Sequence, residues 1–278
     1  MLLRNSENSD EFVEFINSSD AIFHYTKKTT SLENILPNKT IKFGVFSRTN
    51  DPQEYRPKLT GAVGWGWEDE SNEVSDTLKE IELLCKSRSL FLSFCQNTFD
   101  EGELSENGLL KSRMWAQYGD NHEGACIVFS KSKLIKLLGS QITNTQEILI
   151  ESVSYINPER RKQPILHVDQ SDFLKATSND IALDFLRKHK KALLFSKQTD
   201  YRDECEFRVV MVNKSPGLPN ESESFINASN AIEGVVFGDR FPRVYTPTIN
   251  ALLSGSDICA RKLYWHKTGY HLMRLQRE

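Results

Sequence analysis

The sequence predicts an α+β fold: one mixed, mostly antiparallel sheet with helices around it. Strand-like segments outnumber the helices that could connect parallel strands, which argues against a doubly wound sheet. We find no internal repeat, low-complexity tract or linker, so residues 1–278 are interpreted as one domain. The 38% hydrophobic and 26% charged residues are typical of a folded soluble protein.

The elements follow from the spacing of apolar residues. Residues 9–18 have this spacing, with Ser9 or Asp10 as helix cap, so 1–20 forms an N-terminal helical segment before a core at 21–278. Helices are also expected at 29–38, 75–86, 109–118, 130–139, 171–195 and 247–254, the one at 130–139 ending at Gly139. Strands are expected at 21–25, 40–47, 89–95, 124–130, 146–156, 204–212, 232–238, 258–265 and 270–275.

Charge and composition exclude several classes of protein. A formal net charge of −3 gives no global attraction to nucleic acid or anionic membranes, although local basic patches are compatible with it. No apolar run reaches the roughly 20 residues that span a bilayer. The first residues, MLLRNSENSDEF, lack an apolar signal segment, so we expect a cytoplasmic protein without membrane contact. The 5 cysteines are scattered singly, as expected of reduced thiols.

The segment ECEFR, 204–208, is the first candidate for chemistry. On a strand, Glu204, Glu206 and Arg208 share one face, and the apolar VVMV that follows indicates a central strand. Two carboxylates at this spacing can have different catalytic roles: one binds a hydroxyl, and the other acts as a base toward an incoming nucleophile. The alternative is a solvated strand face with an ion pair.

Two further segments carry polar residues near predicted strand ends. Arg48, Asn50, Asp51 and Glu54 follow the strand at 40–47, where loops commonly hold ligands. In RMWAQY, Met114, Trp115 and Tyr118 can cover one helix face, and the polar tips of the aromatic residues suit a cleft edge. An ordinary turn and a core helix are the alternatives.

His24 stands inside the strand AIFHYT, 21–26. A single histidine on a strand is more often a satisfied core residue than a ligand. We expect it nevertheless to face the same hollow as Glu206. No phosphate-binding glycine loop, nucleophile elbow or HExxH motif occurs, which removes the common kinase, Rossmann, hydrolase and zincin interpretations.

The order of these motifs resembles a bacterial family of unknown function, DUF2971. The resemblance lies in FHYT, SLENILPN, FGVFSRTNDPQE, LSFC, MWAQYGDNHEGACIVF, K-x(5)-DECEFRVV and VVFG, and runs from about residue 21 to the C-terminus. Members are often met beside phage-defence genes.

The same layout is similar to that of the ADP-ribosyltransferases and their split sheet. There an early strand carries a histidine or arginine, a middle strand a tyrosine or serine, and a late strand a glutamate. The resemblance implies an NAD-consuming transferase, a phage-defence or toxin effector, that needs no metal and modifies a protein, RNA or DNA acceptor. It assigns the middle-strand position to Ser47 or Ser93.

The resemblance also implies residue roles. Glu206 would bind the ribose 2-OH, Glu204 would accept the proton of the attacking group, and His24 would hold the other ribose. Tyr25 or Tyr118 would stack on nicotinamide, and Arg48 would meet the pyrophosphate. The NAD-binding set is His24, Tyr25, Thr26, Ser47, Arg48, Asn50, Tyr118 and Arg208.

Two other functions stay open on the sequence. A non-enzymatic sensor or antitoxin would contact its partner through Trp65 and Trp67, which stand among glycines. A magnesium-dependent nuclease would use the carboxylates of Asp51, Glu54, Glu204 and Glu206 as metal ligands.

Overall fold

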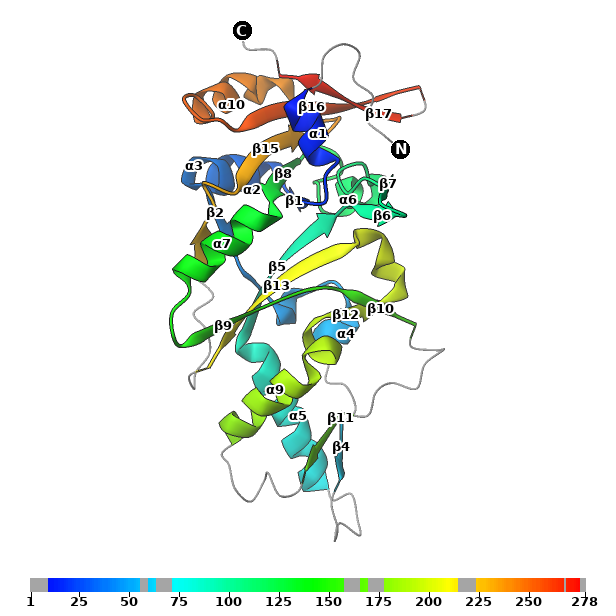
Figure 1. Cartoon of the computed structure of the whole chain (residues 1–278), viewed down its shortest axis with the longest axis vertical. Coiled ribbons are helices and arrows are strands. Elements are labelled where there is room, and N and C mark those ends of the chain that lie inside the picture. Colours follow the sequence, from blue (N-terminus) through cyan, green and yellow to red (C-terminus); the bar gives the residue numbers. More distant parts are fainter. Residues whose placement is uncertain are drawn as a thin grey trace.

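The computed structural model describes residues 10–55, 60–63, 72–157, 166–169, 178–214, 224–267 and 269–275. A nine-stranded sheet runs through this part of the chain (Figure 1). Its order is β17 (Gly269–Arg274), β16 (Cys259–His266), β15 (Ile232–Phe237), β8 (Ala125–Ser130), β1 (Ala21–Thr26), β5 (Ser89–Gln96), β13 (Glu206–Asn213) and β9 (Gln146–Ser152), with β3 (Gly44–Val45) also on β5.

All neighbours in this sheet are antiparallel except β15 and β16. The predicted α+β class with a mixed, mostly antiparallel sheet is therefore confirmed. Four two-stranded ladders accompany the sheet: β10 (Ser154–Ile156) with β12 (Ser196–Gln198), β11 (Leu166–Asp169) with β4 (Thr60–Val63), β14 (Phe225–Asn227) with β2 (Thr40–Lys42), and β6 (Thr98–Asp100) with β7 (Glu103–Glu106).

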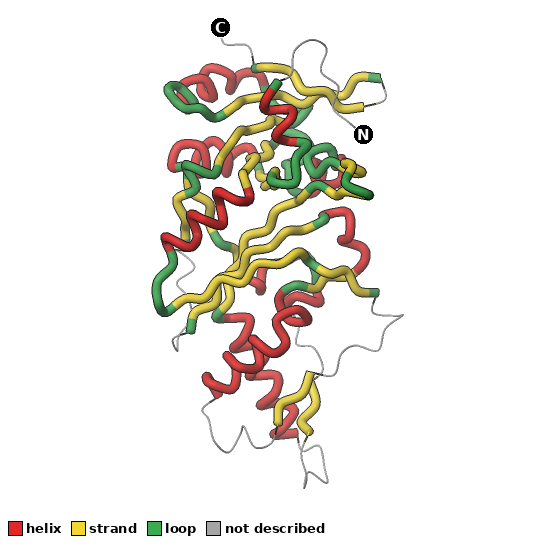
Figure 2. Tube along the Cα trace, viewed as in Figure 1, coloured by secondary structure: helices red, strands yellow, loops and turns green. Residues whose placement is uncertain are grey.

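Helices lie around the sheet, and α5 and α9 pack side by side at one end of it (Figure 2). The helical segments are α1 (Glu11–Ile16), α2 (Lys28–Thr30), the π-helix η1 (Ser31–Ile35), α3 (Leu36–Asn38), the 3₁₀-helix η2 (Phe46–Arg48), α4 (Pro52–Tyr55), α5 (Asn72–Ser87), α6 (Ser112–Gln117), α7 (Lys131–Gln141), α9 (Ser178–Leu194), η3 (Thr199–Glu204, 3₁₀), η4 (Arg243–Tyr245, 3₁₀) and α10 (Thr246–Leu252).

Most predicted elements are present, and the differences have local causes. Asp10 caps α1 through its side chain, as the sequence allowed. The predicted strand 40–47 is divided into β2, β3 and η2. The helix expected to stop at Gly139 continues to Gln141, because Gly139 is exposed and needs no special backbone geometry there.

The register assigns side chains to the two faces of the sheet. Cys95 of β5 lies opposite Phe23 on one side and Glu206 on the other. Directly opposed residues share a face, so these three side chains point the same way. The other face carries Phe94 and Phe207, whose rings lie 6.4 Å apart in the largest apolar core.

Strand β1 follows β5 for only a short distance. The two pair only at Ile22 and Phe23, whereas all of β1 pairs with β8. Farther along the same edge, β3 pairs with β5 at Leu90 and Phe91. Between these contacts, residues 92–94 have no ladder partner on this edge among the described residues.

Candidate functional site

A cluster of five charged side chains is buried on the face of the sheet that carries Cys95. Their exposed fractions are between 1% and 7%. The side chains come from four elements that are separate in the sequence: Glu54 of α4, Lys197 of β12, Glu204 of η3, and Glu206 and Arg208 of β13. We call this set the charged cluster.

The ammonium group of Lys197 lies at the centre of the cluster. Its Nζ is 2.6 Å from Glu204 Oε2, 2.8 Å from Glu206 Oε2 and 3.9 Å from Glu54 Oε2. Burial lowers the pKa of Lys197, but the three carboxylates outweigh it and raise the pKa, so the amine stays charged. The position that a metal ion would need between these carboxylates is therefore occupied by a protein cation.

Arg208 binds two of the carboxylates. Its Nε and Nη2 lie 2.6 Å and 3.0 Å from the two oxygens of Glu206, a bidentate contact. Its Nη1 lies 2.6 Å from Glu54 Oε1 and donates to Leu194 O at 2.6 Å. Arg208 thus fixes both Glu206 and the end of α9.

The two carboxylates at Arg208 titrate in opposite directions. Burial raises the pKa of Glu206, but Arg208 and Lys197 outweigh it and hold that pKa at about 2. At Glu54, burial outweighs the same two cations and raises the pKa. Neither Glu54 oxygen has a well-aligned hydrogen bond. With three carboxylates and two cations, a proton on Glu54 makes the cluster neutral.

The backbone around Glu204 differs from the predicted strand. We expected it on the same strand as Glu206, but β13 begins at Glu206. Glu204 ends η3, and Cys205 adopts the left-handed region with φ 43°. The strand prediction for Glu204 is therefore wrong, although the turn at Cys205 still brings both carboxylates to Lys197.

The sequence NDPQE, 50–54, is folded around Asp51, which is fully buried. Its Oδ1 accepts from Gln53 N at 2.9 Å at the start of α4, where Pro52 suits the first helical position. Its Oδ2 accepts from Gln198 N at 2.8 Å. One carboxylate therefore begins α4 and attaches it to β12, which carries Lys197.

Tyrosine side chains form the outer wall of the cluster. The half-buried Tyr118 donates its hydroxyl to Glu204 Oε1 at 2.7 Å and accepts from Asn50 Nδ2 at 3.3 Å. Tyr201, also half-buried, donates to Asn50 O at 2.9 Å, and its ring centroid lies 5.6 Å from Lys197 Nζ. Burial and then the charge of Glu204 raise the pKa of Tyr118, so its hydroxyl keeps its proton.

His24 does not join this cluster. It neighbours Phe23, so the register turns its side chain to the opposite face from Glu206, against Phe94 with ring centroids 5.8 Å apart. Its Nδ1 lies 3.1 Å from Ser93 O, where β1 leaves β5. The prediction that His24 and Glu206 face one hollow is wrong, because His24 satisfies a backbone carbonyl that the ladder leaves open.

The remaining predicted residues are divided between core and surface. Tyr25 is buried in an aromatic contact with Trp115 and donates to Gly108 O at 2.6 Å. Thr26 is buried at the end of β1, beside β8. Ser47 and Arg48 are exposed on η2, just before Asn50. Trp65 and Trp67 lie outside the described residues.

Trp115 was expected at a cleft edge but is fully buried. Its Nε1 donates to Leu109 O at 2.8 Å, so the polar tip of the indole is satisfied inside the core. Of the aromatic residues predicted on α6 and its end, Tyr118 alone reaches the charged cluster.

Sequence reasoning missed several members of the site. Lys197 stands in the short segment SKQ after an apolar run, a position where a buried lysine needs carboxylate partners. Glu54 was considered only as part of the polar loop after the strand at 40–47 and as a metal ligand. Tyr155 was not considered at all, yet its hydroxyl accepts from Glu206 N at 2.9 Å. No group of three or more His, Cys, Asp or Glu among the described residues is arranged to hold a metal ion.

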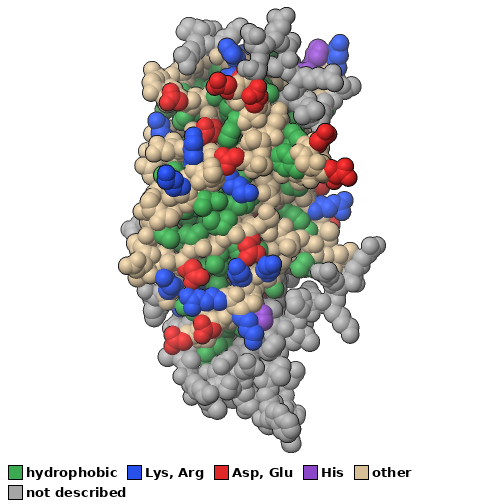
Figure 3. All heavy atoms as spheres, viewed as in Figure 1, with side chains coloured by type: hydrophobic (Ala, Val, Ile, Leu, Met, Phe, Trp, Pro, Cys, Tyr) green, Lys and Arg blue, Asp and Glu red, His purple; other side chains and the backbone are tan. Residues whose placement is uncertain are grey.

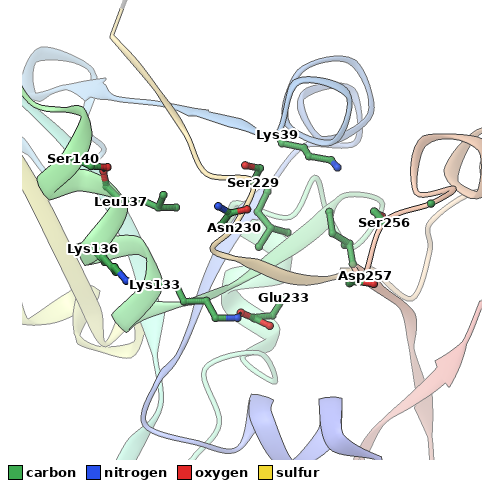
Figure 4. Close-up of a pocket in the computed structure, with 13 residues that line it drawn as sticks. Lys39, Lys133, Lys136, Leu137, Ser140, Ser229, Asn230, Glu233, Ser256 and Asp257 are labelled. Atoms are coloured by element: carbon green, nitrogen blue, oxygen red, sulfur yellow. Dashed lines mark hydrogen bonds and ion pairs between the residues drawn. The ribbon is translucent and has the colours of Figure 1, made fainter.

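A cavity of about 730 Å³ lies elsewhere, between α7 and the loops around 229 and 256 (Figure 4). None of the predicted site residues lines it. Lys133 points toward Glu233, and their ion pair is 2.6 Å long. The lining residues are Lys39, Lys133, Lys136, Leu137, Ser140, Ser229, Asn230, Ile232, Glu233, Gly255, Ser256, Asp257 and Ile258.

Charged side chains of both signs are scattered over the face shown in Figure 3. Within the described residues, no helix has the length and apolar character needed to cross a membrane.

Comparison with known proteins supports one family. Residues 114–209 match the model of the family described as "Protein of unknown function (DUF2971)". The matched segment contains Tyr118, Lys197, Glu204, Glu206 and Arg208. No curated protein and no solved structure matched the chain.

Proposed function

We propose that the protein is an NAD-consuming enzyme of the ADP-ribosyltransferase type, with Glu204 as the carboxylate that meets the substrate. One observation carries this proposal. Glu204 is held by Lys197 on one oxygen, while its other oxygen contacts the hydroxyl of the half-buried Tyr118. A substrate hydroxyl that replaced the Tyr118 hydroxyl would find a charged and oriented acceptor.

The contacts favour Glu204 over Glu206 for this role. Both oxygens of Glu206 already accept from Arg208, and Oε2 also accepts from Lys197. Glu204 has two such contacts, so more of its roughly four acceptor positions are open. We therefore assign Glu206 a positioning role, in which it holds Lys197 and Arg208 in place.

The arrangement of strands supports the same class of enzyme. His24, Ser93 and Glu206 lie on β1, β5 and β13, which are adjacent in the sheet. Ser93 lies directly opposite Arg208, so it shares the face of the charged cluster, as a middle-strand residue of this layout would. In this proposal His24 contacts the backbone of β5 at Ser93 O and does not touch the substrate.

The proposed reaction breaks the bond between nicotinamide and ribose. The bonding electrons leave with nicotinamide, the ribose carbon becomes oxocarbenium-like, and an acceptor oxygen or nitrogen forms the new bond. The proton of the acceptor passes to Glu204, whose Oε2 lies 2.6 Å from Lys197 Nζ. Tyr118 and Tyr201 would contact the flat rings of the substrate, and Arg48, exposed beside Asn50, would meet the pyrophosphate.

The test measures nicotinamide release from NAD, with water as acceptor because the natural acceptor is not assigned. We expect Glu204→Gln to lower turnover by at least about a hundredfold. Tyr118→Phe keeps the ring and removes the hydroxyl that the substrate would displace from Glu204, so it should not raise KM. Glu151→Gln is the matched control, because Glu151 is a half-exposed carboxylate on the neighbouring β9. Wild-type protein that neither binds nor cleaves NAD, or a fully active Glu204→Gln variant, would overturn the proposal.

A further inference from the structure

One face of the hairpin formed by β16 and β17 carries a row of rings. Tyr264, His266 and His271 alternate to the same side, and Tyr264 lies directly opposite His271. The ring centroids of that pair are 5.4 Å apart, and those of the two histidines 5.8 Å. Figure 1 shows the hairpin at one end of the sheet, extending past α10.

These rings are accessible from solvent. His266 is exposed, whereas Tyr264 and His271 are half-buried. Met273, on the same face, is 43% exposed. Strand β17 is the last strand of the sheet, so the described part of the chain places no further strand beside it.

Basic residues lie on both faces of the hairpin. Residues 259–275 contain four Lys or Arg and no Asp or Glu. Lys262 shares the face of the rings, whereas Arg261 and Arg274 point to the opposite face and pair with Asp10. Burial and the positive charge of Arg243 lower the pKa of Lys262, which places two cations close together. Arg240 and Arg243 are exposed and have no ion pair within the described residues, while Asp239 is the nearby acid.

We propose that this face of the hairpin is a binding surface for single-stranded nucleic acid. Unpaired bases stack on exposed aromatic side chains of a sheet, and every base offers a flat face for this contact. Lys262, on the face of the rings, and the nearby Arg243 would contact the phosphates of such a strand. A base-paired duplex keeps its base faces covered, so it cannot use the rings in this way.

This binding surface is independent of the reaction at Glu204. The hairpin lies at one end of the sheet, whereas β13 and the charged cluster lie toward the other end. Binding can therefore be measured without NAD, and its failure would leave the proposed reaction untouched.

The experiment measures fluorescence anisotropy of a labelled oligouridine and of a labelled oligothymidine with the full chain. We expect Tyr264→Ala to weaken binding by about tenfold, because it removes a stacking surface. Tyr264→Phe keeps the ring and should bind like wild type. Trp265→Ala is the matched control, since Trp265 is 53% exposed on the same strand but points to the opposite face.

Salt dependence distinguishes phosphate contacts from stacking. Arg243→Gln should lower the slope of log K against log salt by about 1, while Tyr264→Ala should leave the slope unchanged. Three results would overturn the proposal: binding of duplex as tight as that of single strands, equal loss in Tyr264→Ala and Trp265→Ala, or no binding of any oligonucleotide at low salt.

Discussion

The two faces of β13 are equally buried but stabilised in different ways. On one face, Phe207 and Val209 pack in the largest apolar core. On the other, Glu206 and Arg208 are 1% exposed and belong to the charged cluster. The apolar face gains free energy in proportion to the area it buries, whereas the charged face is stable only while each charge keeps its partner.

The two faces of β13 therefore differ in which substitutions they tolerate. An apolar residue can be replaced by another of similar volume at a small loss. An ionised member of the charged cluster cannot be removed singly, because the charge left behind stays desolvated. Glu54 is the exception, since its raised pKa favours the neutral form. This dependence on partners distinguishes the charged cluster from the apolar core.

The largest expected effect is that of Arg208→Met. It leaves Glu206 and Glu54 without their guanidinium, and we expect a loss of about 3–5 kcal/mol in the free energy of unfolding, measured by urea denaturation. Arg187→Met is the control, since Arg187 pairs with Glu147 at the surface and should change stability by less than about 1 kcal/mol. Equal effects of the two variants would contradict the comparison.

Lys197→Met should be the next most damaging substitution, at about 3 kcal/mol. Because the loss comes from unpaired carboxylates, adding Glu204→Gln to Lys197→Met should recover part of it. A double-mutant cycle measures this coupling. If the two losses simply add, Lys197 does not stabilise Glu204.

On the apolar face, Val209→Ala should destabilise by roughly 2 kcal/mol, through lost burial and the cavity that remains. The same urea titration gives this value. A loss greater than that of Arg208→Met would reverse the ranking of the two faces.

Acid should weaken the charged face selectively. Because Glu206 has its pKa lowered to about 2 from 4.5, its contribution to stability is present above pH 4.5 and is lost as the pH falls toward 2. We expect Glu206→Gln to be less stable at neutral pH but to show a smaller decline over this range. Parallel pH curves for the two proteins would contradict this assignment.

The smallest effect should be that of Glu54→Gln, within about 1 kcal/mol at neutral pH. The pKa of Glu54 is raised, so wild-type stability should decline as the pH rises through that value, and the glutamine variant should not show this decline. A strong loss at neutral pH would indicate that Glu54 is needed as an anion.

Much of the fold could be predicted from the sequence because its signals are local. Alternation placed Glu206 and Arg208 on one strand face, and apolar spacing located the strands of the main sheet. Alternation could not show that His24 points away from Glu206, since that depends on the register of β1 and β13 against β5. The place of Lys197 depends on the parallel pairing of β12 with β10, two strands far apart in the sequence.

The same reasoning explains why the site was only partly predicted. Asn50, Tyr118, Glu204, Glu206 and Arg208 were named in advance, and all of them belong to the cluster or its outer wall. Glu206 and Arg208 were found because they adjoin the apolar run VVMV. Glu204 reached its place through the left-handed backbone of Cys205, which no residue pattern signals.

Asp51 has a mechanical consequence. Its two oxygens join the first turn of α4 to β12, so the segment that carries Asn50 and Glu54 is attached to the strand that carries Lys197. A molecule that displaced Asn50 from Tyr118 would therefore act on the same short loop that positions Glu54 beside Lys197.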